Sequence, residues 1–380
     1  MDIVLLVGSL ALILLGAELF TNGIEWFGHR LNLAEGAVGS VLAAVATAMP
    51  ETLIPVIAIL GPVIVGGPTE SSHAIGVGAI LGAPFMLSTL AMFVTGVAIL
   101  IFARRGRRGT GMRINVGVLG RDVAFFLVGY GIAIGTAFLP AELSLLKWVA
   151  AALLFVLYAV YVRLHFADAP ESTEGEEPNQ LHATRLPGIG GPAAFEPPVA
   201  LDVDFMPGEH DAWEVAGQHP KMRIIVGQVI AALACIIVGA QVFVGAVEHL
   251  STQIGLDATI LALIIAPIAT ELPEKFNSVL WVRTGKDTLA MGNITGAMVF
   301  QSCLPTVLGL LFTTWTFTAE SAVHFASAGV AFVATILIFG TMLRRGSLSA
   351  WTLLIGGPLY LLYVYLALFT PLGAGVAALP

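Results

Sequence analysis

The sequence predicts an all-α membrane protein in which ten transmembrane helices form two inverted five-helix repeats. Three observations lead to this prediction. The 380 residues are 57% hydrophobic and only 11% charged, whereas about a quarter of the residues of a typical soluble domain are charged. Several apolar runs exceed the roughly 18 residues that a membrane helix needs. Two segments far apart in the chain also repeat each other at a constant spacing.

The apolar runs define ten predicted spans, and the basic residues between them indicate the orientation. The first run begins without a basic region or a small-residue cleavage pattern, so we expect it to be retained as a span. Lys and Arg follow spans one, three, seven and nine, and the opposite connections carry none, which predicts that both termini lie outside. The predicted spans are 2–27, 37–61, 73–103, 117–138, 142–164, 223–248, 256–282, 287–313, 319–343 and 348–370.

One long polar segment, 166–221, separates the two halves, 1–165 and 222–380. It holds eleven of the 25 acidic residues, three histidines and many Pro and Gly residues, and it has no sustained apolar period. Such a composition is typical of a flexible linker, here on the cytoplasmic side. A solvated tether is the favoured interpretation, and a regulatory cation site is the alternative.

The two halves repeat each other at an offset of 223 residues. Gly16 to Phe20 matches Gly239 to Phe243, and Glu51 matches Glu274 (239 − 16 = 274 − 51 = 223). Five spans in each half is an odd number, so the second half must enter the membrane from the opposite side. That arrangement is typical of secondary transporters, whose binding site lies at the midplane between the repeats.

Three carboxylates, those of Glu51, Glu271 and Glu274, fall near the centres of spans two and seven. An ionised side chain at that depth costs roughly 2.5–3.5 kcal/mol. Lys275 is expected to point about 100° away from Glu274 on a helix, so no basic residue is expected to neutralise the acids. The sequence therefore predicts that the site is either protonated or filled with cations, although a single intramembrane Glu can also hydrogen-bond in its neutral form.

The neighbouring residues offer further oxygen ligands. Pro50 and Pro273 each leave a backbone carbonyl without its helical partner, and such carbonyls are tolerated where they bind an ion. Hydroxyls of Thr47 and Thr270 and the side-chain carbonyl of Gln301 add to a set that suits hard cations such as Na⁺ and Ca²⁺. The predicted cation ligands are therefore Glu51, Glu274, Glu271, Thr47, Thr270 and Gln301.

The paired segments resemble the two alpha repeats of the calcium/cation antiporter superfamily, which includes the sodium/calcium exchangers. In that family the repeat reads Gly-Thr-Ser-x-Pro-Glu, and a Gly-Asn-rich motif follows on the next helix. The resemblance implies an exchanger-like fold in which Glu51 and Glu274 coordinate the transported ion and Thr47 and Thr270 assist. This sequence departs from the family pattern at Ala48, Ala83, Leu87, Glu271, Ala297 and Gln301.

The resemblance and the paired glutamates predict a secondary active antiporter that exchanges Ca²⁺ against Na⁺ or H⁺ by alternating access, with spans one and six sliding past the others. The alternatives are a monovalent cation exchanger of the same fold, a cation channel and a homologue that does not transport. No motif of an intramembrane enzyme is present. We expect no cofactor, nucleic acid or obligatory protein partner, and a location in the plasma (inner) membrane.

Overall fold

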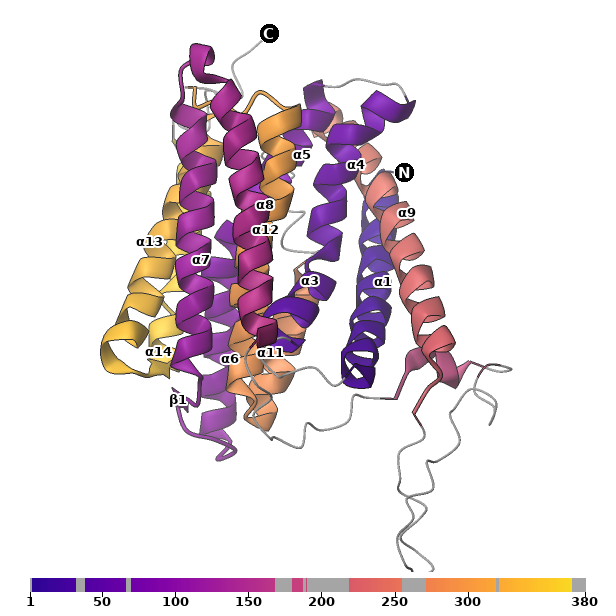
Figure 1. Ribbon diagram of the computed structural model, residues 1–380, viewed down its shortest axis with the longest axis vertical. Coiled ribbons are helices and arrows are strands. Elements are labelled where there is room, and N and C mark those ends of the chain that lie inside the picture. Colours follow the sequence, from indigo (N-terminus) through magenta and orange to yellow (C-terminus); the bar gives the residue numbers. More distant parts are fainter. Residues whose placement is uncertain are drawn as a thin grey trace, which may run out of the picture.

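The computed structural model describes residues 2–31, 38–65, 70–167, 180–186, 189, 219–254, 271–318 and 321–370. These residues form a bundle of helices that run mostly along its long axis (Figure 1). A short antiparallel pair of strands, β1 (Gly111–Met112) and β2 (Leu348–Ser349), joins two loops at one end of the bundle. The predicted linker, 166–221, falls mostly outside the described residues.

In the first half of the chain, most helices begin and end within a few residues of the spans that the apolar runs predict. Its elements are α1 (Asp2–Arg30), η1 (Val38–Ala43), α3 (Ala44–Thr47), α4 (Met49–Val65), α5 (Glu70–Met86), η2 (Leu87–Ala91), α6 (Met92–Arg104), α7 (Val116–Gly135), η3 (Thr136–Phe138), η4 (Ala141–Leu143) and α8 (Leu145–Ala167). Here η1 and η2 are π-helical turns, and η3 and η4 are 3₁₀ turns.

In the second half of the chain, the described helices also lie close to the predicted spans. Its elements are η5 (His182–Arg185), α9 (Met222–Ile254), α11 (Leu272–Thr284), α12 (Asp287–Phe312), α13 (Ala322–Arg345), α14 (Ala350–Leu353) and α15 (Gly356–Phe369). Eight helices among the described residues are long and apolar enough to cross a membrane. The second predicted span is interrupted at Ala48, and the seventh is described only from Glu271 onward, so a total of ten spans stays a prediction.

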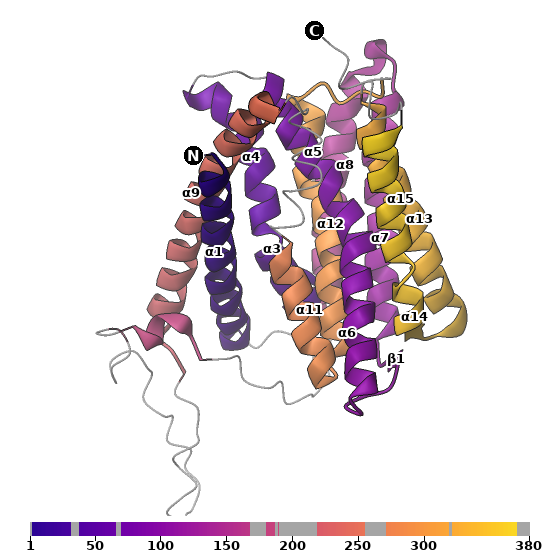
Figure 2. The same ribbon diagram turned by 180° about the vertical axis from the view of Figure 1, so that it is seen from behind.

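Helix α12 lies at the centre of the bundle and is buried along nearly its whole length. It contacts α5, α7, α8, α11 and the η1–α3 segment, which Figures 1 and 2 show arranged around it. Gly296 permits the closest of these approaches, because a Cβ there would overlap the backbone carbonyl of Ser40 in η1. The central helix and the broken second span are therefore in direct backbone contact.

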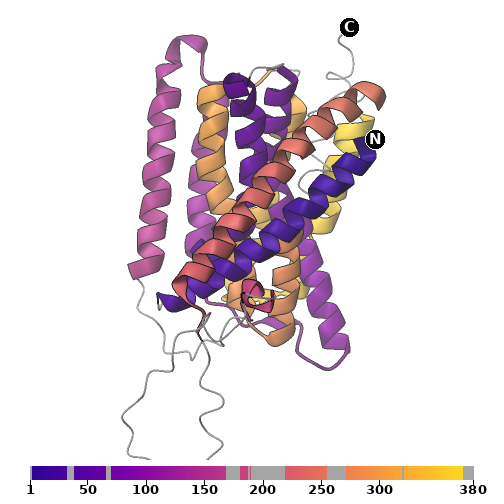
Figure 3. The ribbon, with the colours of Figure 1, turned by 90° about the vertical axis from the view of Figure 1, so that its right-hand side faces the viewer.

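Helices α1 and α9 form an antiparallel pair that crosses the rest of the bundle obliquely (Figure 3). A Cβ on Gly16 would come within 2.8 Å of Ile236 Cγ1, and a Cβ on Gly239 would come within 2.7 Å of Ile13 Cγ1. These contacts are reciprocal, because Ile236 and Gly239 are the repeat equivalents of Ile13 and Gly16 (236 − 13 = 239 − 16 = 223). The two helices therefore present the same surface to each other.

A partly buried ion pair joins the loop after α6 to the start of α12. The Arg108 guanidinium donates to both carboxylate oxygens of Asp287, at 2.7 Å each, and the backbone N–H of Arg113 also donates to this carboxylate. Two-pronged Arg–carboxylate bonds fix orientation as well as supplying energy. This contact anchors the basic loop after α6 to the base of the central helix.

Candidate cation site

The two repeats each begin a helix at the same place. Ala48, between α3 and α4, has φ −81° and ψ 2°, and Glu271, which caps α11, has φ −82° and ψ 8°. The two positions are equivalent at the 223-residue offset. A proline follows each of them by two residues and removes a backbone N–H donor. The proline motif of each half therefore lies at the start of a helix, α4 in the first half and α11 in the second, although the residues just before the two helices differ.

The three predicted glutamates are all buried. Glu51 is 4% exposed, Glu271 is completely buried and Glu274 is 1% exposed. Glu51 lies in the first turn of α4, and Glu274 lies in the first turn of α11. Figures 1 and 2 show α3 and the start of α11 near the middle height of the bundle. The helices that carry Glu51 and Glu274 in their first turns therefore begin near the middle of the bundle.

Thr47 connects the two motifs. Its hydroxyl donates to the side-chain oxygen of Asn293 on α12 at 3.2 Å, and it lies close to the Glu274 carboxylate. Thr47 itself is completely buried. The structure therefore brings a predicted residue of the first repeat to a predicted residue of the second. Thr270, the predicted equivalent of Thr47, lies outside the described residues.

Gln301 also reaches the break in the first repeat. Its side-chain amide donates to the backbone carbonyl of Ala48 at 3.2 Å. Pro305 has no N–H for the backbone carbonyl of Gln301, and the Thr306 hydroxyl donates to that carbonyl instead, at 3.0 Å. Gln301 is thus held at an interrupted turn of α12, with its side chain directed to the broken span.

Several buried oxygens at this place lack a hydrogen-bond donor among the described residues. They are Oε1 of Glu271, Oε2 of Glu274 and Oε1 of Gln301. Buried polar atoms without a partner are rare in native proteins, and each calls for an explanation such as a bound ion. No cluster of three or more His, Cys, Asp or Glu in the described part of the chain has metal-site spacing. A cation here would therefore share carboxylate, amide and hydroxyl oxygens.

Lys275 corrects one expectation from the sequence. Its ammonium lies 2.9 Å from Oε2 of Glu271, one helical turn earlier, and the two side chains are 7% and 0% exposed. The prediction that no basic residue neutralises the midplane acids is therefore wrong for Glu271. The expectation considered only Glu274, from which the Lys275 side chain points about 100° away on a helix. Glu271 lies four residues before Lys275, which is the usual spacing of ion pairs on a helix.

Two other buried polar residues connect the broken span with its neighbours. Asn293 on α12 accepts a hydrogen bond from Thr47 in the first repeat. Asp122 on α7 is completely buried. Its carboxylate accepts bonds from the hydroxyls of Ser40, Tyr161 and Thr295 and lies 3.1 Å from Nε2 of His165. This network links η1 to α7, α8 and α12.

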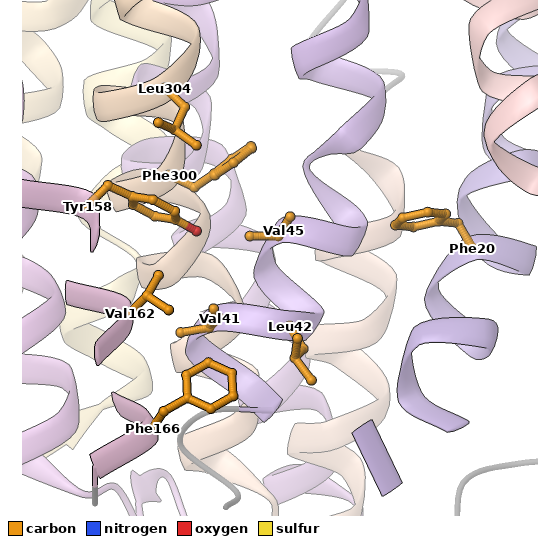
Figure 4. Close-up of a pocket in the computed structure, with 9 residues that line it drawn as sticks. All are labelled: Phe20, Val41, Leu42, Val45, Tyr158, Val162, Phe166, Phe300 and Leu304. Carbon is orange, nitrogen blue, oxygen red and sulfur yellow. The ribbon is translucent and has the colours of Figure 1, made fainter. Parts of the chain in front are cut away.

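A cavity of about 370 Å³ lies beside the break but does not contain the predicted ligands. Figure 4 shows it between α1, the η1–α3 segment, α8 and α12. Its walls are apolar apart from one phenol, and they are formed by Phe20, Val41, Leu42, Val45, Tyr158, Val162, Phe166, Phe300 and Leu304. A cation would find no suitable ligands there, so the cavity is distinct from the candidate cation site.

Comparisons with known proteins agree on one family. A family model described as "Sodium/calcium exchanger protein" matches residues 1–167 and 224–369, which includes most of both halves. A curated protein of Alkalimonas amylolytica, named "Putative antiporter CaxA", is 30% identical over 123 residues. The match covers 31% of this chain and 37% of that relative, so the chain matches little more than a third of the relative's length.

Solved structures share the fold. An H⁺/Ca²⁺ exchanger, CAX, superposes with a TM-score of 0.69 at 15% identity, over 99% of this chain and 85% of that chain. The sodium-calcium exchanger NCX_Mj, soaked with Na⁺ and Sr²⁺, superposes with a TM-score of 0.58 at 16% identity, over 97% of this chain and 100% of that chain. At these identities the similarity establishes the fold alone.

Proposed function

The chain belongs to the sodium/calcium exchanger protein family, and from this membership we propose that it is a secondary active antiporter that exchanges Ca²⁺ against Na⁺ or H⁺. The observation that carries the proposal is the pair of helix starts that follow Ala48 and Glu271 at equivalent positions, which places Thr47 close to Glu274 among buried oxygens that have no donor in the described part of the chain. The similarity to an H⁺/Ca²⁺ exchanger and a sodium-calcium exchanger supports this choice of ions.

In the proposed architecture, ten spans form two inverted repeats around this site. The reciprocal contacts of Gly16 and Gly239 support a two-fold relation between the halves. The start of α1 and the end of α15 lie at the same end of the bundle (Figure 2), as an even number of spans requires. The basic loop after α6 and the basic last turn of α13 lie at the opposite end, which would face the cytoplasm of a plasma (inner) membrane protein with both termini outside.

The proposed ligands are Glu51, Glu271, Glu274, Thr47, Thr270 and Gln301. Ca²⁺ binds six to eight oxygens, and the carboxylates would supply its charge balance while the amide, hydroxyl and freed backbone carbonyls complete the shell. Na⁺ or protons would occupy the same carboxylates in the other half of the cycle. Because an empty, ionised site is costly to enclose in the membrane, the site changes sides only when it is occupied, which couples the two ion flows.

In the proposed mechanism of alternating access, α1 and α9 move together relative to the other helices. The apolar contacts of these two helices form clusters separate from the main core around α12. Sliding of the pair past the remaining helices would leave the main core intact and expose the site first to one side of the membrane and then to the other.

The proposal is tested by exchange in proteoliposomes. The purified protein is reconstituted, and Ca²⁺ uptake is driven by an opposing Na⁺ or H⁺ gradient. Replacing either Glu51 or Glu274 with Gln removes the charge but preserves the shape, so we expect uptake to fall to the level of empty vesicles. Glu142, which is exposed in η4, provides a matched control, because Glu142→Gln should leave exchange unchanged.

Two results would contradict this function. The first is normal uptake by both the Glu51→Gln and the Glu274→Gln variants. The second is no uptake by the wild-type protein together with a melting temperature that neither Ca²⁺ nor Na⁺ raises, since a bound ion stabilises the folded state. The second result would identify a homologue that does not transport.

A further inference from the structure

A second cluster of ionisable groups is buried apart from the candidate cation site, around Asp122 of α7. Asp122 is completely buried, and His165 of α8 is only 1% exposed. Nε2 of His165 lies 3.1 Å from Oδ1 of Asp122, which is the spacing of an ion pair. The other contacts of the Asp122 carboxylate are with the hydroxyls of Ser40, Tyr161 and Thr295. None of these residues is a proposed cation ligand.

The surroundings of His165 favour a proton between its ring and Asp122. Nδ1 lies 3.0 Å from the backbone carbonyl oxygen of Tyr161, which can only accept, so Nδ1 carries a hydrogen. Nε2 lies close to Oδ1 but has no aligned hydrogen-bond partner among the described residues. Without a proton, its lone pair would face those of a carboxylate oxygen. A proton on Nε2 or on Oδ1 turns this repulsion into attraction.

The hydroxyl groups around Asp122 allow its carboxyl group to gain a further proton. The Thr295 hydroxyl lies 2.6 Å from Oδ2 of Asp122 and 2.9 Å from the Met291 carbonyl oxygen. The Tyr161 hydroxyl lies 2.9 Å from Oδ1 and 3.1 Å from the Ser40 carbonyl oxygen. Each hydroxyl has one hydrogen and two acceptors, so both can donate to the ionised carboxylate. When Oδ2 is protonated it donates to Thr295, and both hydroxyls turn to the backbone carbonyls.

The same cluster anchors the first turn of the broken second span. The Ser40 hydroxyl in η1 donates to Oδ2 of Asp122 at 3.1 Å. Hydrogen bonds to an ionised carboxylate are roughly twice as strong as those between neutral groups. Protonation of Asp122 therefore weakens the hold on Ser40, which precedes Thr47 by seven residues (47 − 40 = 7). The protonation state of Asp122 is thus linked to the segment that carries Thr47 into the candidate cation site.

A purely structural role explains less of this arrangement. Buried ion pairs contribute little net stability compared with well-packed apolar residues, so joining four helical segments does not require one. Among the described residues, the titratable groups that face Asp122 are Tyr161 and His165 on α8, and η1 and α12 contribute hydroxyls only. The guanidinium of Arg121, the neighbour of Asp122 on α7, donates to the Leu164 carbonyl at 3.3 Å.

We propose that Asp122 and His165 form a proton-binding site, separate from the transport site, through which pH sets the rate of exchange. Asp122 lies in the second turn of α7 and His165 in the last turn of α8, both toward the end of the bundle that carries the basic loop after α6. A hydronium ion from the water at that end supplies the proton, and an O–H bond forms at Oδ2. The weakened anchor lets η1 shift, which slows the exchange.

Infrared difference spectroscopy tests the proton site without any transport. Spectra of the purified protein are compared at about pH 8 and about pH 5, on either side of the usual titration of histidine. The wild-type protein should gain the band of a protonated carboxyl group on acidification, and Asp122→Asn should lack it. Glu142→Gln changes an exposed acid and should retain the band. Identical spectra for the wild type and Asp122→Asn would overturn the proton site.

The effect on rate rests on the proposed antiport and is measured in proteoliposomes. Exchange of labelled for unlabelled Ca²⁺ needs no gradient of Na⁺ or H⁺, and at saturating Ca²⁺ protons no longer compete at the transport site. The maximal rate of the wild type should fall at least about threefold from about pH 8 to about pH 5, because the anchor weakens. Asp122→Asn is neutral at every pH and should show the acid rate throughout.

Matched variants separate proton binding from its effect. Ser40→Ala leaves the titrating pair in place but removes the hydroxyl of η1, so it should keep the carboxyl band and lose most of the pH dependence of the maximal rate. Thr295→Val removes the oxygen that accepts the new proton, so it should shift the frequency of the band. An unchanged band in Thr295→Val would assign it to another acid and overturn the site.

The outcomes for the site and for the antiport are distinct. A wild-type pH profile in either Asp122→Asn or Ser40→Ala would overturn the control of rate. If size-exclusion chromatography shows that Asp122→Asn does not fold, Thr295→Val and Ser40→Ala decide the two parts of the proposal. Absence of any Ca²⁺ exchange by the wild-type protein would refute the proposed function, whereas the infrared result would still decide whether Asp122 binds a proton.

Discussion

At the scale of single residues, Thr47 has a central position because its hydroxyl serves both repeats. It donates a hydrogen bond to Asn293 on the central helix, lies close to Glu274 in the second motif, and is completely buried. A single hydroxyl therefore connects the first broken span with two other helices. Its removal would leave the Asn293 amide oxygen without that partner and change the surroundings of the Glu274 carboxylate.

Replacing Thr47 with Ala should weaken cation binding without preventing folding. One hydrogen bond contributes about 1 kcal/mol, so the Ca²⁺ concentration for half-maximal uptake should rise about three- to tenfold. Thr47→Ser keeps the hydroxyl and serves as the control, with an expected change of less than twofold. Equal effects of the two substitutions would mean that the methyl group, and not the hydroxyl, matters at this position.

Some residues of the candidate site stand out in the sequence more clearly than others, and the reason is physical. Glu51 and Glu274 are recognisable because a charge in an apolar run is costly and because the repeat places them in register. The pairing of Lys275 with Glu271 could have been predicted from their i to i+4 spacing, but Lys275 was compared only with Glu274. The hydrogen bond from Gln301 to the Ala48 carbonyl could not have been predicted, because it depends on how α12 is rotated against another helix.

At the scale of helices, hydrophobic runs predicted where the spans lie but not how their interiors are built. The predicted span 73–103 is found as α5, the π-helical turn η2 and α6, and the predicted span 37–61 begins with another π-helical turn. Hydropathy does not distinguish these turns from regular helix, because the same apolar residues form both. Proline was the informative signal, since Pro50 and Pro273 each lie in the first turn of a helix, α4 and α11.

The reciprocal glycines of α1 and α9 lead to a prediction about stability. Gly16→Ala and Gly239→Ala should each cost about 1–3 kcal/mol, because the added methyl group meets a buried isoleucine and a backbone carbonyl. Their effects should be equal within error, since the two contacts are equivalent. Melting temperatures in detergent would show this as two similar decreases.

The controls for this prediction lie on the same two helices. A Cβ added to Gly8 in α1 or to Gly245 in α9 would meet no other atom within 4 Å among the described residues. Alanine at either place should leave the melting temperature unchanged or raise it slightly, because Ala favours helix more than Gly does. A large decrease for Gly16→Ala with none for Gly239→Ala would contradict the symmetry of the contact.

At the scale of the whole molecule, the apolar cavity separates α1 from the helices around α12. Phe20 lines it from α1, and Leu42 and Val45 line it from the broken span (Figure 4). Movement of α1 along the bundle would change the shape of this space directly. The cavity is therefore a place where added volume should affect motion more than ion binding.

Filling the cavity should slow exchange. Leu42→Trp adds bulk to its wall, so we expect the maximal rate of Ca²⁺ uptake to fall at least fivefold while the increase in melting temperature caused by Ca²⁺ persists. Leu42→Met conserves volume and should exchange at the wild-type rate. If the tryptophan variant retains the full rate, α1 does not need this space in order to move.

The surface shared by α1 and α9 has a consequence for the origin of the chain. Contacts in which residue 13 meets 239 and residue 16 meets 236 become identical when the halves are exchanged, as in the interface of a symmetric homodimer. A polypeptide with only one half would already carry both sides of this interface in a single helix. Gene duplication and fusion would then join two subunits that were able to recognise each other beforehand.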